Sequence, residues 1–324
     1  MDENLLARIE ALKLSRRAGA QASPNDADAA WLSQWVVHKH FAEIDSTQSY
    51  VERESGSFDQ DKLTVISADV QTAGRGTRER SWHAVQAQSA LMTFYFRFPE
   101  ESSTEFANRN APNVTQVLAV STIDALRSTV CQEGLAFCVK WPNDVVVNGK
   151  KIAGILARAE MSPGPRLDRI IVGIGVNINT SQADLDSIHR PVWPATSLRA
   201  VSGVETTYDI SAFRDTLVST FARALRSFFV DGFAGIRGRF NTLDVFMDKD
   251  ICFQVDENTV FEATYLGIND SGHVMLRLAN GKLQALPSGE VVPRPFGPAP
   301  PRAPEASDGR GSVSEVSRQG RVLR

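Results

Sequence analysis

The chain has 324 residues, of which 42% are hydrophobic and 23% charged, a composition typical of a folded protein with a sizeable core and long enough for two units. A formal net charge of −3 argues against a polybasic surface for nucleic acid or an anionic membrane. No apolar run approaches the ~20 residues of a membrane-spanning helix. Three cysteines without metal-ligand spacing predict reduced thiols and a cytoplasmic protein.

Residues 1–35 are predicted to be an N-terminal extension, partly helical or disordered. Leu5, Leu6, Ile9 and Leu12 form a short helical stripe, after which the sequence becomes polar. The segment is too short for a three-helix DNA-binding domain with a linker. Its acidic start argues against a secretory signal, and an organellar targeting role for residues 1–30 is the alternative.

Residues 36–242 are predicted to be the main domain. Apolar patterning predicts strands at residues 63–68, 91–98, 137–140, 145–147, 152–157 and 169–176. Asn148-Gly149 is a strong hairpin signal, because both central residues of a type I′ turn need positive φ. Helices are expected from Asn113, which can cap the first one, and from Ile210. Because this order is not a βαβ rhythm, we expect an α+β fold.

Residues 243–294 change in character to short strands joined by tight turns, which predicts a small C-terminal β-barrel. From residue 295 to residue 324 Pro, Arg, Ser and Gly dominate, and this tail is expected to be disordered.

A glycine-rich loop, QTAGRGTRERSW, runs from Gln71 to Trp82. Its two glycines allow backbone N–H groups to approach an anion, and its arginines offer planar donors for phosphate or carboxylate. The loop is neither a Walker loop nor a dinucleotide fingerprint. A solvated basic turn is the alternative interpretation.

Two further segments contain residues that cost folding free energy at their positions unless they serve a function. Lys140-Trp141-Pro142-Asn143-Asp144 places an ammonium, an amide and a carboxylate around a proline, although an exposed turn with a solvated lysine is the alternative. Gly173-Ile174-Gly175-Val176-Asn177 puts two glycines into a strand, which indicates either a ligand close to the backbone or plain strand packing. Asp45-Ser46-Thr47-Gln48 is read on its own as a helix cap.

Taken together and in this order, these motifs resemble the biotin–protein ligase (holocarboxylase synthetase) family in its monofunctional form. The resemblance covers about residues 36–292. The matching segments are Asp45-Ser46-Thr47, Gln71 to Gly76 with Trp82, Lys140 to Asp144, Lys151 to Leu156, Gly173 to Asn177 and Ala195 to Arg199.

The resemblance implies a catalytic domain with a mixed sheet like that of class II aminoacyl-tRNA synthetases, followed by a β-barrel. It implies an ATP-dependent ligase that forms biotinyl-5′-AMP and passes biotin to a lysine of a biotin carboxyl carrier domain. ATP and Mg²⁺ would be needed, without a metal site built from protein ligands.

The same resemblance assigns roles to individual residues. The biotin pocket would be lined by Ser46, Thr47, Gln48, Gln71 and Gly154, with Arg75, Gly76 and Thr77 on a loop that closes over it. Lys151 would hold the biotin carboxylate or the α-phosphate.

The nucleotide would be contacted by Arg75, Lys151, Asn143 and Asn177, with Trp82 over the adenine. Catalysis would rest on Arg75 and Lys151, on Lys140 as positive charge near the triphosphate, and on Asp144 to orient the carrier lysine.

The loop departs from the family pattern at two positions. Thr77 stands where a second arginine is common and Glu79 where a glycine is common, and Arg78 is a possible substitute. Three alternatives remain: a lipoate or octanoate ligase, a biotin-sensing DNA-binding regulator, and a biotin-binding protein without catalysis, which only Thr77 supports. The Lys-Trp-Pro-Asn segment fits biotin ligases better than lipoate ligases.

Overall fold

The computed structural model describes residues 24–77, 80–82, 84–130, 132, 134–161, 164–187, 193–203, 205, 207–256, 258–292 and 321–323. The chain divides into two compact units, residues 1–36 and 37–324. In the first unit, helix α2 (Pro24–Trp35) stacks the rings of Trp31 and Trp35 with centroids 5.1 Å apart. The predicted helical stripe from Leu5 to Leu12 lies outside the described residues. No described helix is long and apolar enough to cross a bilayer.

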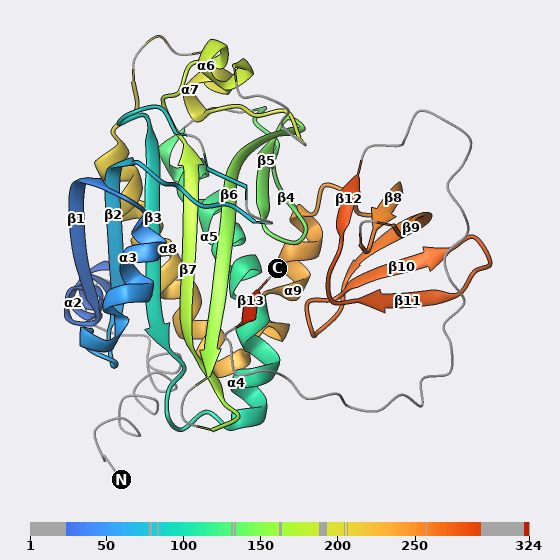
Figure 1. Cartoon of the computed structure of the whole chain (residues 1–324), viewed down its shortest axis with the longest axis horizontal. Helices are drawn as coiled ribbons and strands as arrows, with labels where there is room; N and C mark the ends of the chain where they lie inside the picture. Colours follow the sequence, from blue (N-terminus) through green and yellow to red (C-terminus); the bar gives the residue numbers. More distant parts are fainter. Residues whose placement is uncertain are drawn as a thin grey trace. The chain divides into compact units, whose positions relative to one another are not determined.

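An eight-stranded sheet forms the main part of the second unit (Figure 1). Its order is β1–β2–β3–β7–β6–β5–β4, with β13 beside β6, and the ladders from β2 to β4 are antiparallel. The strands are β1 (Val36–Ile44), β2 (Leu63–Gln71), β3 (Ser89–Arg97), β4 (Phe137–Lys140), β5 (Asp144–Val147), β6 (Lys150–Met161), β7 (Leu167–Asn177) and β13 (Arg321–Leu323).

Every strand predicted for the main domain is present, and the β5–β6 hairpin turns at Asn148 and Gly149 with φ of 48° and 76°. Both central residues therefore have the positive φ that the type I′ prediction required. The central strands β3 and β7 are almost wholly buried, as expected for strands covered on both faces.

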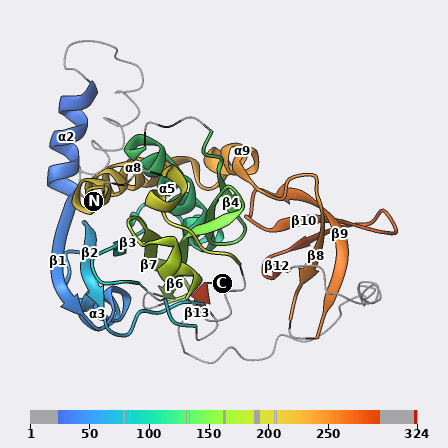
Figure 2. The ribbon, with the colours of Figure 1, turned by 90° about the horizontal axis from the view of Figure 1, so that it is seen from above.

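Helices cover the two faces of this sheet, with α5 and α8 on one face and α3 on the other (Figures 1 and 2). Phe94 of β3 meets Phe221 of α8 edge to face at 4.8 Å between ring centroids, which anchors the core on that side. The helices are α3 (Thr47–Glu54), α4 (Thr104–Asn110), α5 (Val114–Thr129), α6 (Gln182–Asp186), α7 (Leu198–Ser202), α8 (Ile210–Asp231) and α9 (Ala234–Leu243), with short 3₁₀ turns at Ser55–Ser57 and Ala111–Asn113.

The two long helices expected from the sequence are confirmed, but the cap predicted at Asn113 is wrong. A 3₁₀ turn precedes α5, so the Asn113 side chain donates back to the carbonyl of Arg109 at 3.3 Å and caps nothing.

A second, antiparallel sheet follows α9 and has the order β11–β10–β9–β8–β12. Its strands are β8 (Asp250–Gln254), β9 (Val260–Ile268), β10 (Val274–Leu278), β11 (Leu283–Leu286) and β12 (Glu290–Val292). The indole of buried Trp141 donates to the carbonyl of Gly272 in the β9–β10 turn at 3.1 Å, which joins this sheet to the main domain. The expected α+β fold with a C-terminal β domain is confirmed. Of the predicted tail, residues 295–320 and 324 lie outside the described residues.

Candidate active site

The floor of the site is a pair of opposed glycines on two central strands. Gly154 of β6 lies directly across from Gly175 of β7, and the indole of Trp82 lies on both. A Cβ at Gly175 would come within 2.3 Å of Cε2 of Trp82, and one at Gly154 within 2.8 Å of Cζ3. The glycines are therefore needed for close approach of a flat group rather than for an unusual backbone. The buried Nε1 of Trp82 has no hydrogen-bond partner among the described residues.

One polar wall is the start of α3. Ser46 caps this helix by accepting from the backbone N–H of Ser49 at 3.4 Å, so the helix-cap interpretation is confirmed. Thr47 donates from its backbone N–H and its hydroxyl to Oε1 of Gln71, at 2.7 and 2.9 Å. Gln48 points at Gly173, whose added Cβ would meet its Oε1 at 2.8 Å. The cap therefore also presents buried hydroxyl and amide groups to the site.

The glycine-rich loop folds back on itself as a small hairpin. Gly76 donates to the carbonyl of Arg80 at 2.7 Å, and Trp82 donates to that of Gly74 at 3.0 Å. The guanidinium of Arg80 donates to the hydroxyl of Thr77 at 3.1 Å. Arg78 and Glu79, which the sequence comparison marked as a substitute and a departure, lie outside the described residues.

A buried carboxylate between two lysines forms the charged corner of the site. Lys151 lies 2.6 Å from Oδ1 of Asp144, and Lys140 lies 3.4 Å from Oδ2. Burial alone would raise the pKa of Asp144, but the two ammonium groups outweigh it and hold the pKa below its ordinary value. The alternative of an exposed turn is excluded, because the Lys140 side chain is only 3% exposed. Asn143 donates to the carbonyl of Ile155 at 2.7 Å and so fixes the turn against β6.

These groups surround one open cavity. Its walls combine hydroxyls, amides and two cations with the aliphatic side chains of β3, β6 and β7. The lining residues are Ser46, Thr47, Gln48, Gln71, Arg75, Gly76, Thr77, Trp82, Leu91, Met92, Thr93, Asn143, Asp144, Lys151, Gly154, Ile155, Leu156, Gly173, Ile174 and Gly175.

Residues 40–177 match the model of the biotin/lipoate A/B protein ligase family. A biotin–[acetyl-CoA-carboxylase] ligase of Paracoccus denitrificans is 32% identical over 229 residues, which cover 70% of this chain and 88% of that protein. The chain belongs to the biotin–protein ligase family.

Other relatives agree with this assignment. The bifunctional ligase/repressor BirA of Bacillus spizizenii is 26% identical over 244 residues, which cover 75% of this chain and 70% of that protein. A structure of the biotin protein ligase from Aquifex aeolicus in complex with biotin and ATP superposes with a TM-score of 0.61 at 24% identity, covering 78% of this chain and 97% of that one. This likeness shows that the fold is the one found in that protein.

The structure brings most of the predicted ligase residues to the cavity but leaves two outside its lining. Lys140 approaches Asp144 from behind, with its Nζ 5.2 Å from the ring centroid of Trp193. The Asn177 amide donates to the carbonyl of Thr196 at 3.1 Å. Both side chains are buried next to the site without lining the cavity.

Sequence analysis of the ligase missed the part of the lining that β3 contributes. Leu91, Met92 and Thr93 come from a strand that was recognised, but its burial on both faces hid which side chains face a ligand. Their position follows from the register, which sets Leu91 opposite Gly175 and Thr93 opposite Gly173. The spacing of the two glycines was the available signal, because alternate residues of a strand share a face.

Proposed function

We propose that this ligase activates biotin with ATP as biotinyl-5′-AMP and transfers the biotinyl group to a lysine of a biotin carboxyl carrier domain. The observation that carries the proposal is the cavity itself. It brings together buried hydroxyl and amide groups of α3 and β2, the floor formed by Gly154 and Gly175, and the cations Lys151 and Arg75. A neutral polar ring, a short aliphatic chain and a carboxylate fit these three surroundings in turn.

In the first half-reaction the biotin carboxylate would attack the α-phosphorus of ATP. A carboxylate oxygen–phosphorus bond forms and the bond to the β-phosphate oxygen breaks, so pyrophosphate leaves. Two anions must approach each other, and Lys151 and Arg75 are the cations that line the cavity. Lys151 is 28% exposed and reaches the cavity, whereas Lys140 is only 3% exposed and holds the other side of Asp144.

In the second half-reaction the amine of the carrier lysine would attack the carbonyl carbon of the anhydride. The new carbon–nitrogen bond displaces AMP, and the nitrogen loses a proton. Asp144 lines the cavity with a lowered pKa and therefore remains a carboxylate that can accept a hydrogen bond from the incoming amine. We propose that it orients this amine.

The residues of the site do not fit a Mg²⁺ ion held by the protein. The described residues contain no group of three or more His, Cys, Asp and Glu side chains that could hold a metal. Asp144 is the acidic side chain of the described lining, and two lysines already contact it. Mg²⁺ would therefore arrive as the counterion of the ATP phosphates, as is usual for this ion, and we derive no step through it.

The test is biotin-dependent exchange of labelled pyrophosphate into ATP, with lipoate and octanoate in parallel. Of the three acids, we expect exchange only with biotin, since the hydroxyl and amide groups at the start of α3 suit a polar ring better than an aliphatic chain. Exchange with lipoate or octanoate but not biotin would replace the proposed substrate, and exchange with none would reject the activity.

The acceptor is tested by mass spectrometry of an isolated carrier domain. We expect one biotinyl addition at a single lysine and none when that lysine is replaced by arginine. The cytoplasm is the proposed place of this reaction, on the grounds of the cysteine content given above.

A further inference from the structure

Glu52 lies on α3 one helical turn beyond Gln48, and it joins the glycine-rich loop to the sheet. Its Oε2 accepts a hydrogen bond from Nη1 of Arg75 at 2.7 Å. Its Oε1 lies 3.7 Å from Nη1 of Arg158 on β6 and accepts no hydrogen bond from the residues that the structure describes. Residues four apart on a helix share a face, so the helix that presents Gln48 to the cavity also presents Glu52 to the loop.

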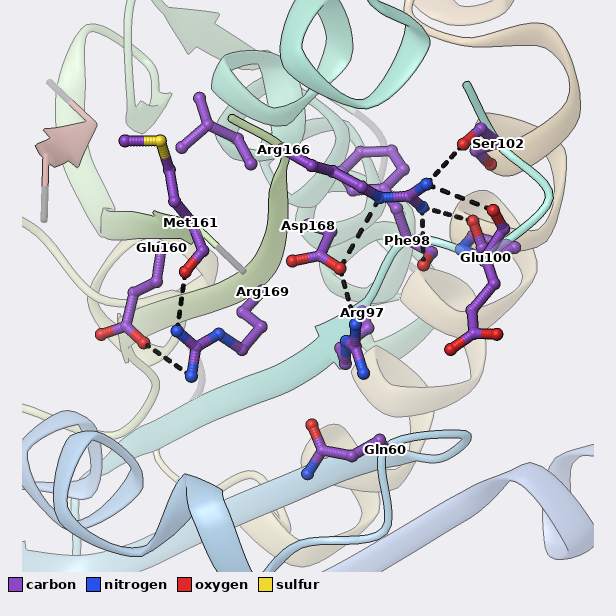
Figure 3. A network of polar contacts seen from close by, with 12 residues as sticks. Gln60, Arg97, Phe98, Glu100, Ser102, Glu160, Met161, Arg166, Asp168 and Arg169 are labelled. Atoms are coloured by element: carbon purple, nitrogen blue, oxygen red, sulfur yellow. Dashed lines mark hydrogen bonds and ion pairs between the residues drawn. The ribbon is translucent and has the colours of Figure 1, made fainter. Parts of the chain in front are cut away.

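The ion pair to Arg158 is the first link of a chain of alternating charges on the sheet. Nε of Arg158 lies 3.5 Å from Glu160, and Glu160 lies 3.8 Å from Nη1 of Arg169. Arg169 also donates to the carbonyl of Met161 at 2.8 Å (Figure 3). Glu160 and Arg169 are cross-strand partners on β6 and β7. The cation that faces Glu52 therefore stands on β6, an inner strand of the sheet that is paired on both sides.

Arg75 belongs to the small hairpin of the glycine-rich loop, and besides Glu52 its guanidinium has a long hydrogen bond to the hydroxyl of Ser49, at 3.5 Å. It lies between Gly74 and Gly76, and its side chain is 41% exposed. A long side chain at such a position loses rotamer freedom when it is fixed, and this loss opposes binding. A partner that fixes it before the substrate arrives removes this cost from substrate binding.

We propose that Glu52 is a positioning residue that holds the Arg75 guanidinium at the cavity. Glu52 does not line the cavity and would touch neither biotin nor ATP. Nη1 of Arg75 donates to Glu52 and to Ser49, and the other N–H groups can meet an anion in the cavity, because a guanidinium carries five donors. The inference rests on the proposed function, since the anion that Arg75 would meet is the carboxylate or phosphate of that reaction.

A second role for Glu52 is competition with the substrate for the Arg75 guanidinium. If the Arg75–Glu52 ion pair stood alone, it would agree with competition as well as with positioning. The geometry favours positioning, because Glu52 stands between two guanidiniums and its charge is shared. The two roles predict effects of opposite sign on substrate binding, so one substitution separates them.

The experiment compares Glu52→Gln with Glu54→Gln, a neighbouring carboxylate on the exposed side of the same helix. In the pyrophosphate-exchange assay we expect KM for biotin to rise about three- to tenfold in Glu52→Gln. This range corresponds to ~1 kcal/mol for a charge-assisted hydrogen bond that solvent partly screens. We expect kcat to change less than KM, Glu52→Asp to recover part of the loss, and Glu54→Gln to match the wild type.

A second readout needs no turnover. Tryptic cleavage after Arg75 in the ligand-free protein should be faster in Glu52→Gln than in the wild type and Glu54→Gln, at unchanged Tm. Wild-type KM and cleavage rates in Glu52→Gln, or a KM below that of the wild type, would overturn the positioning role. A wild-type protein without biotin-dependent exchange would instead overturn the proposed function, and the cleavage experiment would still decide whether Glu52 holds the loop.

Discussion

Replacing Gly175 by alanine adds a single methyl group to the floor of the cavity. The backbone of Gly175 is not in the left-handed region, so alanine fits its conformation and the effect comes from Cβ alone. That Cβ would lie 2.3 Å from Cε2 and 2.5 Å from Nε1 of Trp82. Normal contacts between such atoms are about 3.5–4.0 Å, so the ring must move by more than about 1 Å.

The loop can yield more easily than the sheet, so we expect the indole to be displaced. An inserted methyl group in a packed site costs about 1–3 kcal/mol, which corresponds to a fivefold to 150-fold loss of affinity. KM for biotin or ATP in pyrophosphate exchange should rise within this range, while Tm stays near that of the wild type. The result should be the same whether the indole or a ligand occupies the floor, because either needs the space.

Gly56→Ala is the matched control, since an added Cβ there meets nothing within 4 Å and the backbone has no positive φ. It should leave both KM values unchanged. If Gly175→Ala also had wild-type KM values for both substrates, the two glycines would not form a floor for closely packed groups, and the argument from their opposition would fail.

Three further predictions concern the charged groups. Lys151→Met should lower biotin-dependent exchange at least tenfold, because it removes a cation from the cavity lining; exchange at the wild-type rate would contradict this. Lys140→Met should raise the pKa of Asp144 and move the acid limb of the pH profile for biotin transfer to higher pH, and an unmoved limb would contradict the two-lysine arrangement. Asp244 is buried and accepts a hydrogen bond from Tyr265 at 2.5 Å, and burial raises its pKa to about 6. The folded state therefore keeps a proton on Asp244 up to about pH 6, whereas the unfolded state releases it near pH 4. The wild type should therefore lose up to ~3 kcal/mol relative to Asp244→Asn as the pH rises from 4 to 7, measured by urea unfolding, and a constant difference would contradict the raised pKa.

Much of the fold could be predicted from local patterns. The Asn148-Gly149 turn followed from the φ that a tight hairpin demands, and the strands from their apolar runs. The absence of a side-chain cap at Asn113 could not be predicted in this way, because a 3₁₀ turn precedes α5 and gives Asn113 a backbone conformation unsuited to capping.

Candidate site residues were identified from their residue types and their order in the chain, but their roles depend on the direction in which each side chain points. Lys140 and Lys151 look alike as lysines near an aspartate, yet one is buried behind Asp144 and the other reaches the cavity. No spacing distinguishes these positions, because β4 and β6 lie on either side of β5. For the same reason Glu52 was not identified, since its partners Arg75 and Arg158 are far away along the chain.

The sequence by itself determined the α+β class, the hairpin, the capped start of α3 and the motifs that resemble biotin–protein ligases. These depend on local backbone preferences and on residues a few positions apart. Only the tertiary structure decided that Gly154 stands opposite Gly175, that Trp82 covers them, and which of the two lysines beside Asp144 lines the cavity. The reason is physical: strand register and side-chain direction are set by packing between segments distant in sequence, and a shift of one residue turns every side chain to the other face.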